Sequence, residues 1–240
     1  VEICVTSVDA AKIAERAGAD RLELCSELAV GGVTPSAGLL EAIRDTVAIP
    51  VHVLIRPRSG NFAYSEPTLS QMLRDISYCR KLGFDGIVTG CLLSDNRLDR
   101  VGMESLVEAC GDLYLTFHRA FDRIPDWEAA LSDLEVLGVD TILTSGQAAS
   151  ALQGLPRLEA LVQKAHWGIM PGGGIRPSNL EPFIGKGFEA VHLSAIESPG
   201  PELFSGLALN TTGLLREGGP LLPDAGNIEA VVNAIKATGK

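Results

Sequence analysis

A short pattern recurs four times along this chain and restricts its possible folds more than any other feature. A helix-like stretch ends in Gly, one variable residue and an acidic residue follow, and a short apolar run comes next. The four glycines of this pattern are Gly18, Gly83, Gly138 and Gly187. Glycine ends helices readily because it adopts the left-handed conformation without a Cβ penalty. The runs after it resemble strands buried on both faces, so the pattern predicts helices alternating with parallel strands.

Four further apolar runs lie between these repeats and bring the predicted strands to eight. The strands are predicted at residues 2–6, 21–25, 51–55, 86–90, 113–117, 141–145, 168–171 and 190–194. One strand–helix unit for about every 30 residues is the size expected of a TIM-type (β/α)8 barrel. We therefore expect a single α/β barrel domain over residues 1–240, closed by pairing of its first and eighth strands.

Helix starts are predicted by residues that can cap the first turn. These residues are Ser7, Ser36, Asp99 and Asp126. The Pro-Ser-Asn sequence at 177–179 predicts a further helix before Gly187. Residues 198–224 break the rhythm with five Gly and four Pro. We interpret them as an irregular excursion before a last helix at 228–238.

Composition excludes several classes of function. The net charge is −10 with acids and bases interspersed, which argues against nucleic acid or an anionic membrane as the partner. No apolar run approaches the roughly 20 residues of a membrane span. The five cysteines have no close paired spacing and no secretory leader is visible, so we expect reduced thiols in a cytoplasmic protein. The oligomeric state stays open, a homo-oligomer included.

Polar side chains should point into the barrel, because side chains alternate along a strand and the helix layer requires apolar contacts. A barrel interior is usually filled with Val, Ile and Leu, and buried polar groups must be paired. Two interpretations stay open: a self-satisfied polar network or a functional cleft. Glu2 and Arg21, at the amino-terminal ends, suit the first. The carboxyl-terminal ends of strands, where such barrels place their chemistry, suit the second.

The candidate cleft contains acid–base groups and anion-binding groups. Glu23 and His118 are the candidate acid–base pair of an enzyme. Arginine suits a carboxylate or phosphate because it donates two hydrogen bonds at once. Glycine amides after the seventh strand offer further donors. The expected anion- or substrate-binding residues are Arg56, Arg58, Arg119, Thr144, Gly172, Gly173, Gly174 and Ser194.

Cys4 and Cys25 are predicted to face the same way on neighbouring strands. Neighbouring strands lie about 4.8 Å apart. Two thiolates across that gap could hold a soft ion such as Cu(I), which prefers sulfur ligands. The alternative is a pair of buried, inert thiols.

Several motifs, taken together, resemble the CutC family. They are Glu-Leu-Cys-Ser at 23–26, Gly-Gly-Val-Thr-Pro-Ser at 31–36, Ile-Arg-Pro-Arg-Ser-Gly-Asn-Phe at 55–62, Leu-Gly-Phe-Asp-Gly at 82–86, Phe-His-Arg-Ala-Phe-Asp at 117–122, Leu-Thr-Ser-Gly at 143–146 and the glycines at 172–174. The resemblance implies a cytosolic TIM-type barrel associated with copper homeostasis, with Cys4 and Cys25 as Cu(I) ligands. The rival hypothesis is an enzyme that acts on a small anionic metabolite at the barrel mouth. The expected partner is therefore a copper ion or a small anionic molecule.

Overall fold

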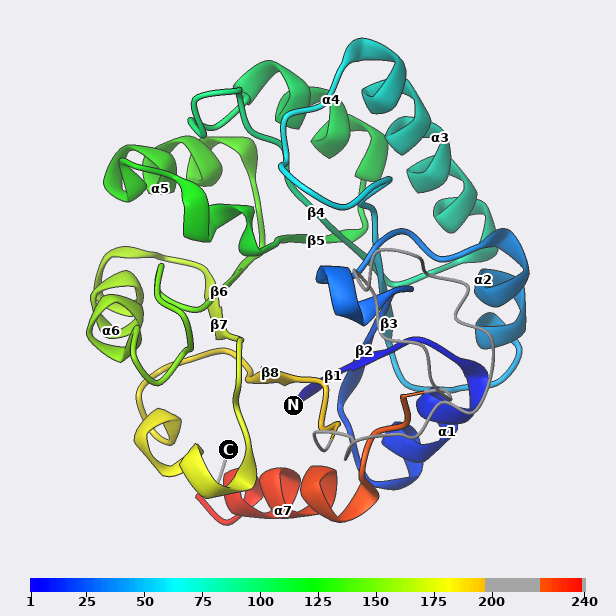
Figure 1. The fold of residues 1–240 in the computed structure, drawn as a ribbon, viewed down its shortest axis with the longest axis vertical. Coiled ribbons are helices and arrows are strands. Elements are labelled where there is room, and N and C mark those ends of the chain that lie inside the picture. The colour runs from blue at the N-terminus through cyan, green and yellow to red at the C-terminus, as the bar shows by residue number, and fades with distance from the viewer. Residues whose placement is uncertain (197–220, 239–240) are drawn as a thin grey trace, which may run out of the picture.

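A nearly closed ring of parallel strands forms the centre of the structure, and helices surround it (Figure 1). The computed structural model describes residues 1–196 and 221–238. Within these residues the strands are hydrogen-bonded in the order β7-β6-β5-β4-β3-β2-β1-β8. Their bounds are β1 (Glu2–Val5), β2 (Arg21–Leu24), β3 (Val51–Leu54), β4 (Gly86–Thr89), β5 (Tyr114–Phe117), β6 (Thr141–Thr144), β7 (Gly168–Pro171) and β8 (His192–Leu193). The predicted TIM-type barrel is confirmed.

The barrel closes at its shortest strand. β8 pairs in parallel with β1, Glu2 opposite His192 and Ile3 opposite Leu193, which confirms the predicted pairing of the first and last strands. On its other side β8 meets the end of β7 through a parallel bridge between Gly172 and His192. The predicted strand at 190–194 is too long, because regular pairing here extends over two residues.

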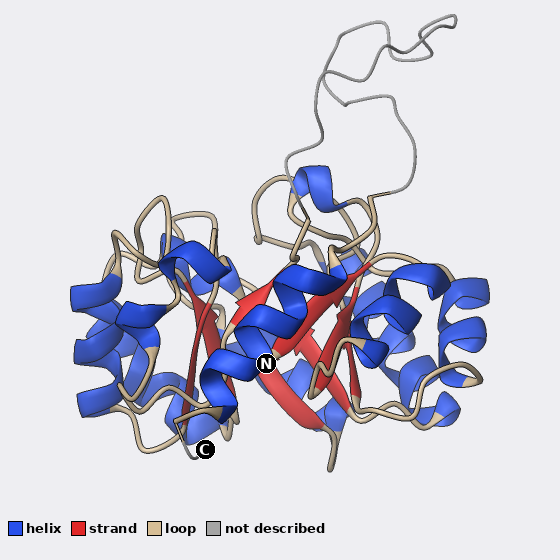
Figure 2. Ribbon diagram, turned by 90° about the horizontal axis from the view of Figure 1, so that it is seen from below, coloured by secondary structure: helices blue, strands red, loops and turns tan. Residues whose placement is uncertain are grey.

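Each predicted capping residue begins a helix. Side-chain oxygens of Ser7, Ser36, Asp99 and Asp126 accept hydrogen bonds from first-turn N–H groups. The helices are α1 (Val8–Arg16), α2 (Ala37–Arg44), α3 (Glu66–Leu82), α4 (Arg100–Cys110), α5 (Trp127–Leu137), α6 (Leu155–Lys164) and α7 (Ala225–Lys236). The helices flank the strands on both sides in the view of Figure 2. Their buried apolar residues join those of the strands in one large core.

The segment between β7 and β8 corrects one prediction. In this described stretch two 3-10 turns, Pro177–Asn179 and Glu181–Phe183, replace the expected helix. Pro182 explains the difference, because proline has no N–H to donate and its ring clashes with the preceding helical turn. Gly187 has φ +85°, but it follows these turns and ends no helix.

Other element boundaries also differ from the predictions. α6 was not predicted at all. α7 begins at Ala225, earlier than the predicted residue 228, because the Asp224 carboxylate accepts a hydrogen bond from the Asn227 N–H and caps the helix there. Of the predicted excursion at 198–224, residues 198–220 lie outside the described residues, so that prediction stays untested.

Candidate functional site

A cavity of about 860 Å³ lies at the carboxyl-terminal ends of the strands. Its volume is in the range of small-molecule sites. Predicted site residues in its lining are Cys4, Glu23, Arg56, His118, Arg119, Gly173, Gly174 and Ser194. The predicted residues outside the lining are Cys25, Arg58, Thr144 and Gly172. The topology thus gathers distant segments at one mouth, because all parallel strands end on the same side.

The two candidate thiols lie in contact with each other. Cys4 in β1 and Cys25, directly after β2, have their sulfur atoms 3.3 Å apart. Both side chains are buried, and Cys4 also borders the cavity. The hydrogen bond with Cys25, together with burial, raises the pKa of the Cys4 thiol well above its ordinary value. The predicted common facing of the two thiols is confirmed.

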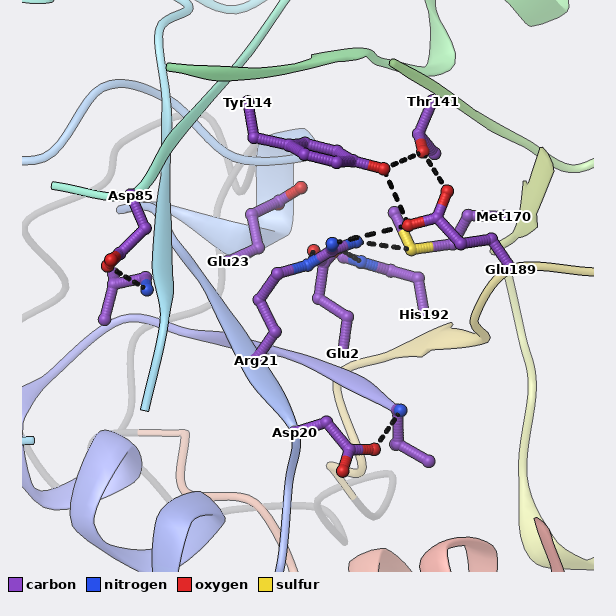
Figure 3. Close-up of polar contacts among 12 residues, drawn as sticks. Glu2, Asp20, Arg21, Glu23, Asp85, Tyr114, Thr141, Met170, Glu189 and His192 are labelled. Atoms are coloured by element: carbon purple, nitrogen blue, oxygen red, sulfur yellow. Dashed lines mark hydrogen bonds and ion pairs between the residues drawn. The ribbon is translucent and has the colours of Figure 1, made fainter. Parts of the chain in front are cut away.

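Two further groups lie close enough to Cys4 to share a metal ion with it. Ligand atoms of Cys4, Glu23 and His192 are within 4.8 Å of one another. Cys4 Sγ is 3.5 Å from Glu23 Oε1. On the other side of the histidine ring, His192 Nδ1 is 2.8 Å from Glu2 Oε1 (Figure 3). A carboxylate on one ring nitrogen is the usual way in which a metal-binding histidine is oriented.

An ion-pair network fills the barrel interior on the other side of Glu2 (Figure 3). Arg21 Nε donates to Glu2 Oε2 at 2.6 Å, and Arg21 Nη1 is 3.6 Å from Glu189 Oε1. The Arg21 guanidinium lies over the Tyr114 ring, and the Tyr114 hydroxyl donates to Glu189 at 2.6 Å. Glu2 and Arg21 are therefore paired, which agrees with the interpretation of a self-satisfied network at the amino-terminal ends. The members of this network satisfy one another, whereas His52 Nδ1, on the ring beside Tyr114, has no hydrogen-bond partner among the described residues.

The charges along this network set opposite protonation preferences. Burial would raise the pKa of Glu2, but the hydrogen bond from His192 and the charge of Arg21 outweigh it and lower that pKa to about 2. Burial would lower the pKa of His192, but the charge of Glu23 and the contact with Glu2 outweigh it and raise that pKa. Burial raises the pKa of Glu23. Glu2 therefore stays ionised, whereas burial opposes ionisation of Glu23.

His118 follows β5 and is held as a neutral donor. Its Nδ1 accepts the N–H of Ala120 at 3.3 Å, so the ring proton lies on Nε2. Nε2 is buried and has no hydrogen-bond partner among the described residues. Burial and the charge of Arg56 lower the pKa of His118 to about 3. Gly90 leaves room for the ring, because a Cβ there would lie 2.8 Å from His118 Nδ1.

The arginines after β3 serve mainly to shape loops. Arg56 Nη1 donates to the carbonyls of Val30 and Gly32 at 2.8 and 2.7 Å, and Nη2 donates to Gly60. Exposed Arg58 donates to carbonyls and to an amide oxygen of residues 59–63 of its own loop. Of the two, Arg56 lines the cavity.

Around Asp122, the loops after β5 and β6 are joined. Arg119 Nε donates to Asp122 Oδ2 at 2.7 Å, and Arg119 Nη2 donates to Ser145 at 2.9 Å. The hydroxyl of Thr144 also donates to Asp122, which accounts for its position outside the cavity lining. Arg119 Nη1 has no hydrogen-bond partner among the described residues.

Sequence reasoning missed three basic residues of the cavity lining. One is His192 in β8, and the other two are Arg123 and Arg176. The position of the two arginines in the sequence could have identified them, because both follow a predicted strand. Arg123 is the last residue of the 3-10 turn after β5, and Arg176 follows the glycines after β7.

These features define a class of protein: a parallel (β/α)8 barrel with a polar cavity at the carboxyl ends of its strands and a thiol pair in its wall. Within that class the chain belongs to the CutC family, whose family model matches residues 1–197.

Curated relatives and solved structures agree with this assignment. A family protein CutC from Proteus mirabilis (strain HI4320) is 47% identical over 196 residues, covering 81% of this chain and 78% of the relative. A human copper homeostasis protein cutC homolog is 47% identical over 198 residues, covering 81% of this chain and 72% of the relative. The crystal structure of the CutC protein from Streptococcus agalactiae has a TM-score of 0.77 at 34% identity, covering 80% of this chain and 97% of that one.

More distant structures share the fold alone. Thiamine phosphate pyrophosphorylase from Pyrococcus furiosus has a TM-score of 0.60 at 12% identity, covering 98% of this chain and 94% of that one. Among the described residues, none of the helices is both long and apolar enough to cross a membrane.

Proposed function

We propose that this protein binds Cu(I) through Cys4 and Cys25, in a role in copper homeostasis. The observation that carries the proposal is the 3.3 Å separation of two buried sulfur atoms on neighbouring strands. Thiolate sulfur is the ligand that Cu(I) prefers. Binding must displace the thiol protons, because thiolates rather than thiols ligate metals.

His192 supports the same proposal as a candidate third ligand. It lies within the cluster around Cys4, and imidazole also suits copper. His192 Nδ1 lies 2.8 Å from Glu2 Oε1, and Arg21 Nε donates to Glu2 Oε2 at 2.6 Å. The network would therefore fix the ring before a metal arrives, so that little ordering is required on binding.

The first prediction tests the thiols. The variant Cys4→Ala/Cys25→Ala should lose the Cu(I) that the wild-type protein binds at about one ion per chain, because a single two-sulfur site is removed. The measurement is anaerobic titration against a chromogenic Cu(I) chelator, with X-ray absorption to count the sulfur ligands. Undiminished binding by this variant would refute the proposal.

A matched control uses two other buried thiols. Cys79 on α3 and Cys110 on α4 are fully buried in the helix layer. The variant Cys79→Ala/Cys110→Ala removes the same number of sulfur atoms and should bind Cu(I) as the wild-type protein does. The variant His192→Gln separates the roles further: it should weaken binding and lower the nitrogen count around copper without removing the sulfur ligands.

A further inference from the structure

The charge of the mouth cavity is opposite in sign to that of the whole chain. The chain carries −10, whereas the cavity lining contains four arginines and two carboxylates. The arginines are Arg56, Arg119, Arg123 and Arg176, and the carboxylates are Glu23 and Asp122. A cleft that collects one sign of charge raises the local concentration of ligands of the other sign.

The carboxylates do little to neutralise these arginines. Asp122 is already paired with Arg119, and it accepts hydrogen bonds from the hydroxyl groups of Thr144 and Ser145. Glu23 is buried, its Oε1 lies 3.5 Å from Cys4 Sγ, and it forms no ion pair with an arginine among the described residues. Arg123 and Arg176 are exposed and have no ion-pair partner among the described residues. Two guanidinium groups at the rim are thus available to a ligand.

Two buried side chains that line the cavity carry polar atoms without partners. Glu23 Oε2 and His118 Nε2 have no hydrogen bond among the described residues, although each side chain is only 5% exposed. Buried polar atoms are rarely left unpaired, because each such group costs free energy. A ligand hydroxyl suits both, since it accepts from His118 Nε2–H and either donates to or accepts from Glu23.

We propose that the mouth cavity binds a small hydroxylated anion, a sugar phosphate or hydroxy acid, with its charged group at Arg123 and Arg176 and its hydroxyl groups toward Glu23 and His118. Guanidinium groups bind phosphate and carboxylate through paired, charge-assisted hydrogen bonds. Gly173 and Gly174 also line the cavity, and their φ values of +107° and +78° favour glycine there, so no side chain of their own covers the backbone N–H groups. Glu23 also contacts Cys4, but the arginine end of the site contains neither thiol, so substitutions at Arg123 and Arg176 test the anion proposal independently of copper.

Ribose 5-phosphate, glucose 6-phosphate and citrate serve as probes, with ribose, glucose and inorganic phosphate as matched controls. The experiment is isothermal titration of the full chain, supported by thermal shift, because a bound ligand raises the melting temperature by mass action. At least one hydroxylated anion should bind, and it should bind more tightly than its neutral counterpart and than inorganic phosphate. The proposal fails if no probe binds, or if neutral and charged probes bind equally.

Variants then locate the site. Arg123→Ala/Arg176→Ala should weaken binding at least about tenfold, the loss expected when charge-assisted hydrogen bonds are removed. Arg74→Ala, an exposed arginine on α3, should have no effect. His118→Phe should weaken binding of the hydroxylated anion more than that of inorganic phosphate. Unchanged affinity in the double arginine variant would overturn the assignment.

Discussion

Two histidines buried in the barrel interior have pKa values far below the ordinary value. Burial and the charge of Arg21 lower the pKa of His52 to about 4, and burial with the charge of Arg56 lowers that of His118 to about 3. Both rings are therefore neutral in the folded protein at neutral pH. Because their pKa values differ between the folded and the unfolded chain, the free energy of unfolding depends on pH.

Stability should fall as the pH drops below about 6.5, the ordinary histidine value. Below this pH the unfolded chain binds protons at His52 and His118, whereas the folded protein does not. The difference ends only near the folded-state pKa values, about 4 for His52 and about 3 for His118. His192 acts in the opposite direction, because its raised pKa lets the folded form bind a proton first. The variant His118→Gln should make the decline shallower, as measured by urea unfolding between pH 7 and pH 4.5.

The control for this measurement is His166→Gln, since His166 is exposed. Its stability curve should run parallel to that of the wild-type protein. Parallel curves for His118→Gln as well would contradict the neutral, buried state that we assign to His118.

At the scale of elements, the loop around Gly32 covers the thiol pair. Arg56 holds this loop by donating to the carbonyls of Val30 and Gly32. Gly32 has φ +83°, and a Cβ there would lie 2.7 Å from Leu54 Cδ2 and 3.5 Å from Cys25 Sγ. The loop can lie this close to the sulfur because residue 32 has no side chain.

Gly32→Ala should destabilise the protein by about 1–3 kcal/mol, because a left-handed non-glycine residue is strained and the new methyl group meets Leu54. It should also weaken Cu(I) binding, since the loop must move away from Cys25. Gly38→Ala on α2 is the matched control: a Cβ there meets nothing within 4 Å. That helix substitution should stabilise by about 0.4–1 kcal/mol. Equal effects of the two substitutions would contradict this account.

For the whole molecule, the Arg21 network connects strands that are distant in sequence. Arg21 in β2 holds Glu2 in β1 and lies near Glu189, which precedes β8. Glu189 in turn accepts hydrogen bonds from Tyr114 in β5 and Thr141 in β6. The network therefore spans the barrel where β8 joins its neighbours.

Arg21→Ala should cost about 3–5 kcal/mol of unfolding free energy, because it leaves the buried Glu2 carboxylate without its cation. Chemical denaturation would measure the loss. Arg74→Ala, on the exposed face of α3, should change stability by less than about 0.5 kcal/mol. A comparably small change for Arg21→Ala would show that the network contributes little to closing the barrel.

The sequence by itself determined the barrel and the facing of its interior residues. Recurrent glycines, capping residues and apolar runs are local signals, and alternation along two strands was enough to place Cys4 beside Cys25. These features depend on a residue and its near neighbours, so they can be read along the chain.

Only the tertiary structure decided which polar groups became partners. It placed His192 beside Cys4, tied Thr144 to Asp122 and left Arg58 outside the cavity while Arg176 lines it. It also replaced the helix expected at 177–187 with short turns. Side-chain partners come from strands and loops far apart in sequence, and burial makes pairing obligatory without specifying the partner. That choice depends on how the whole barrel closes.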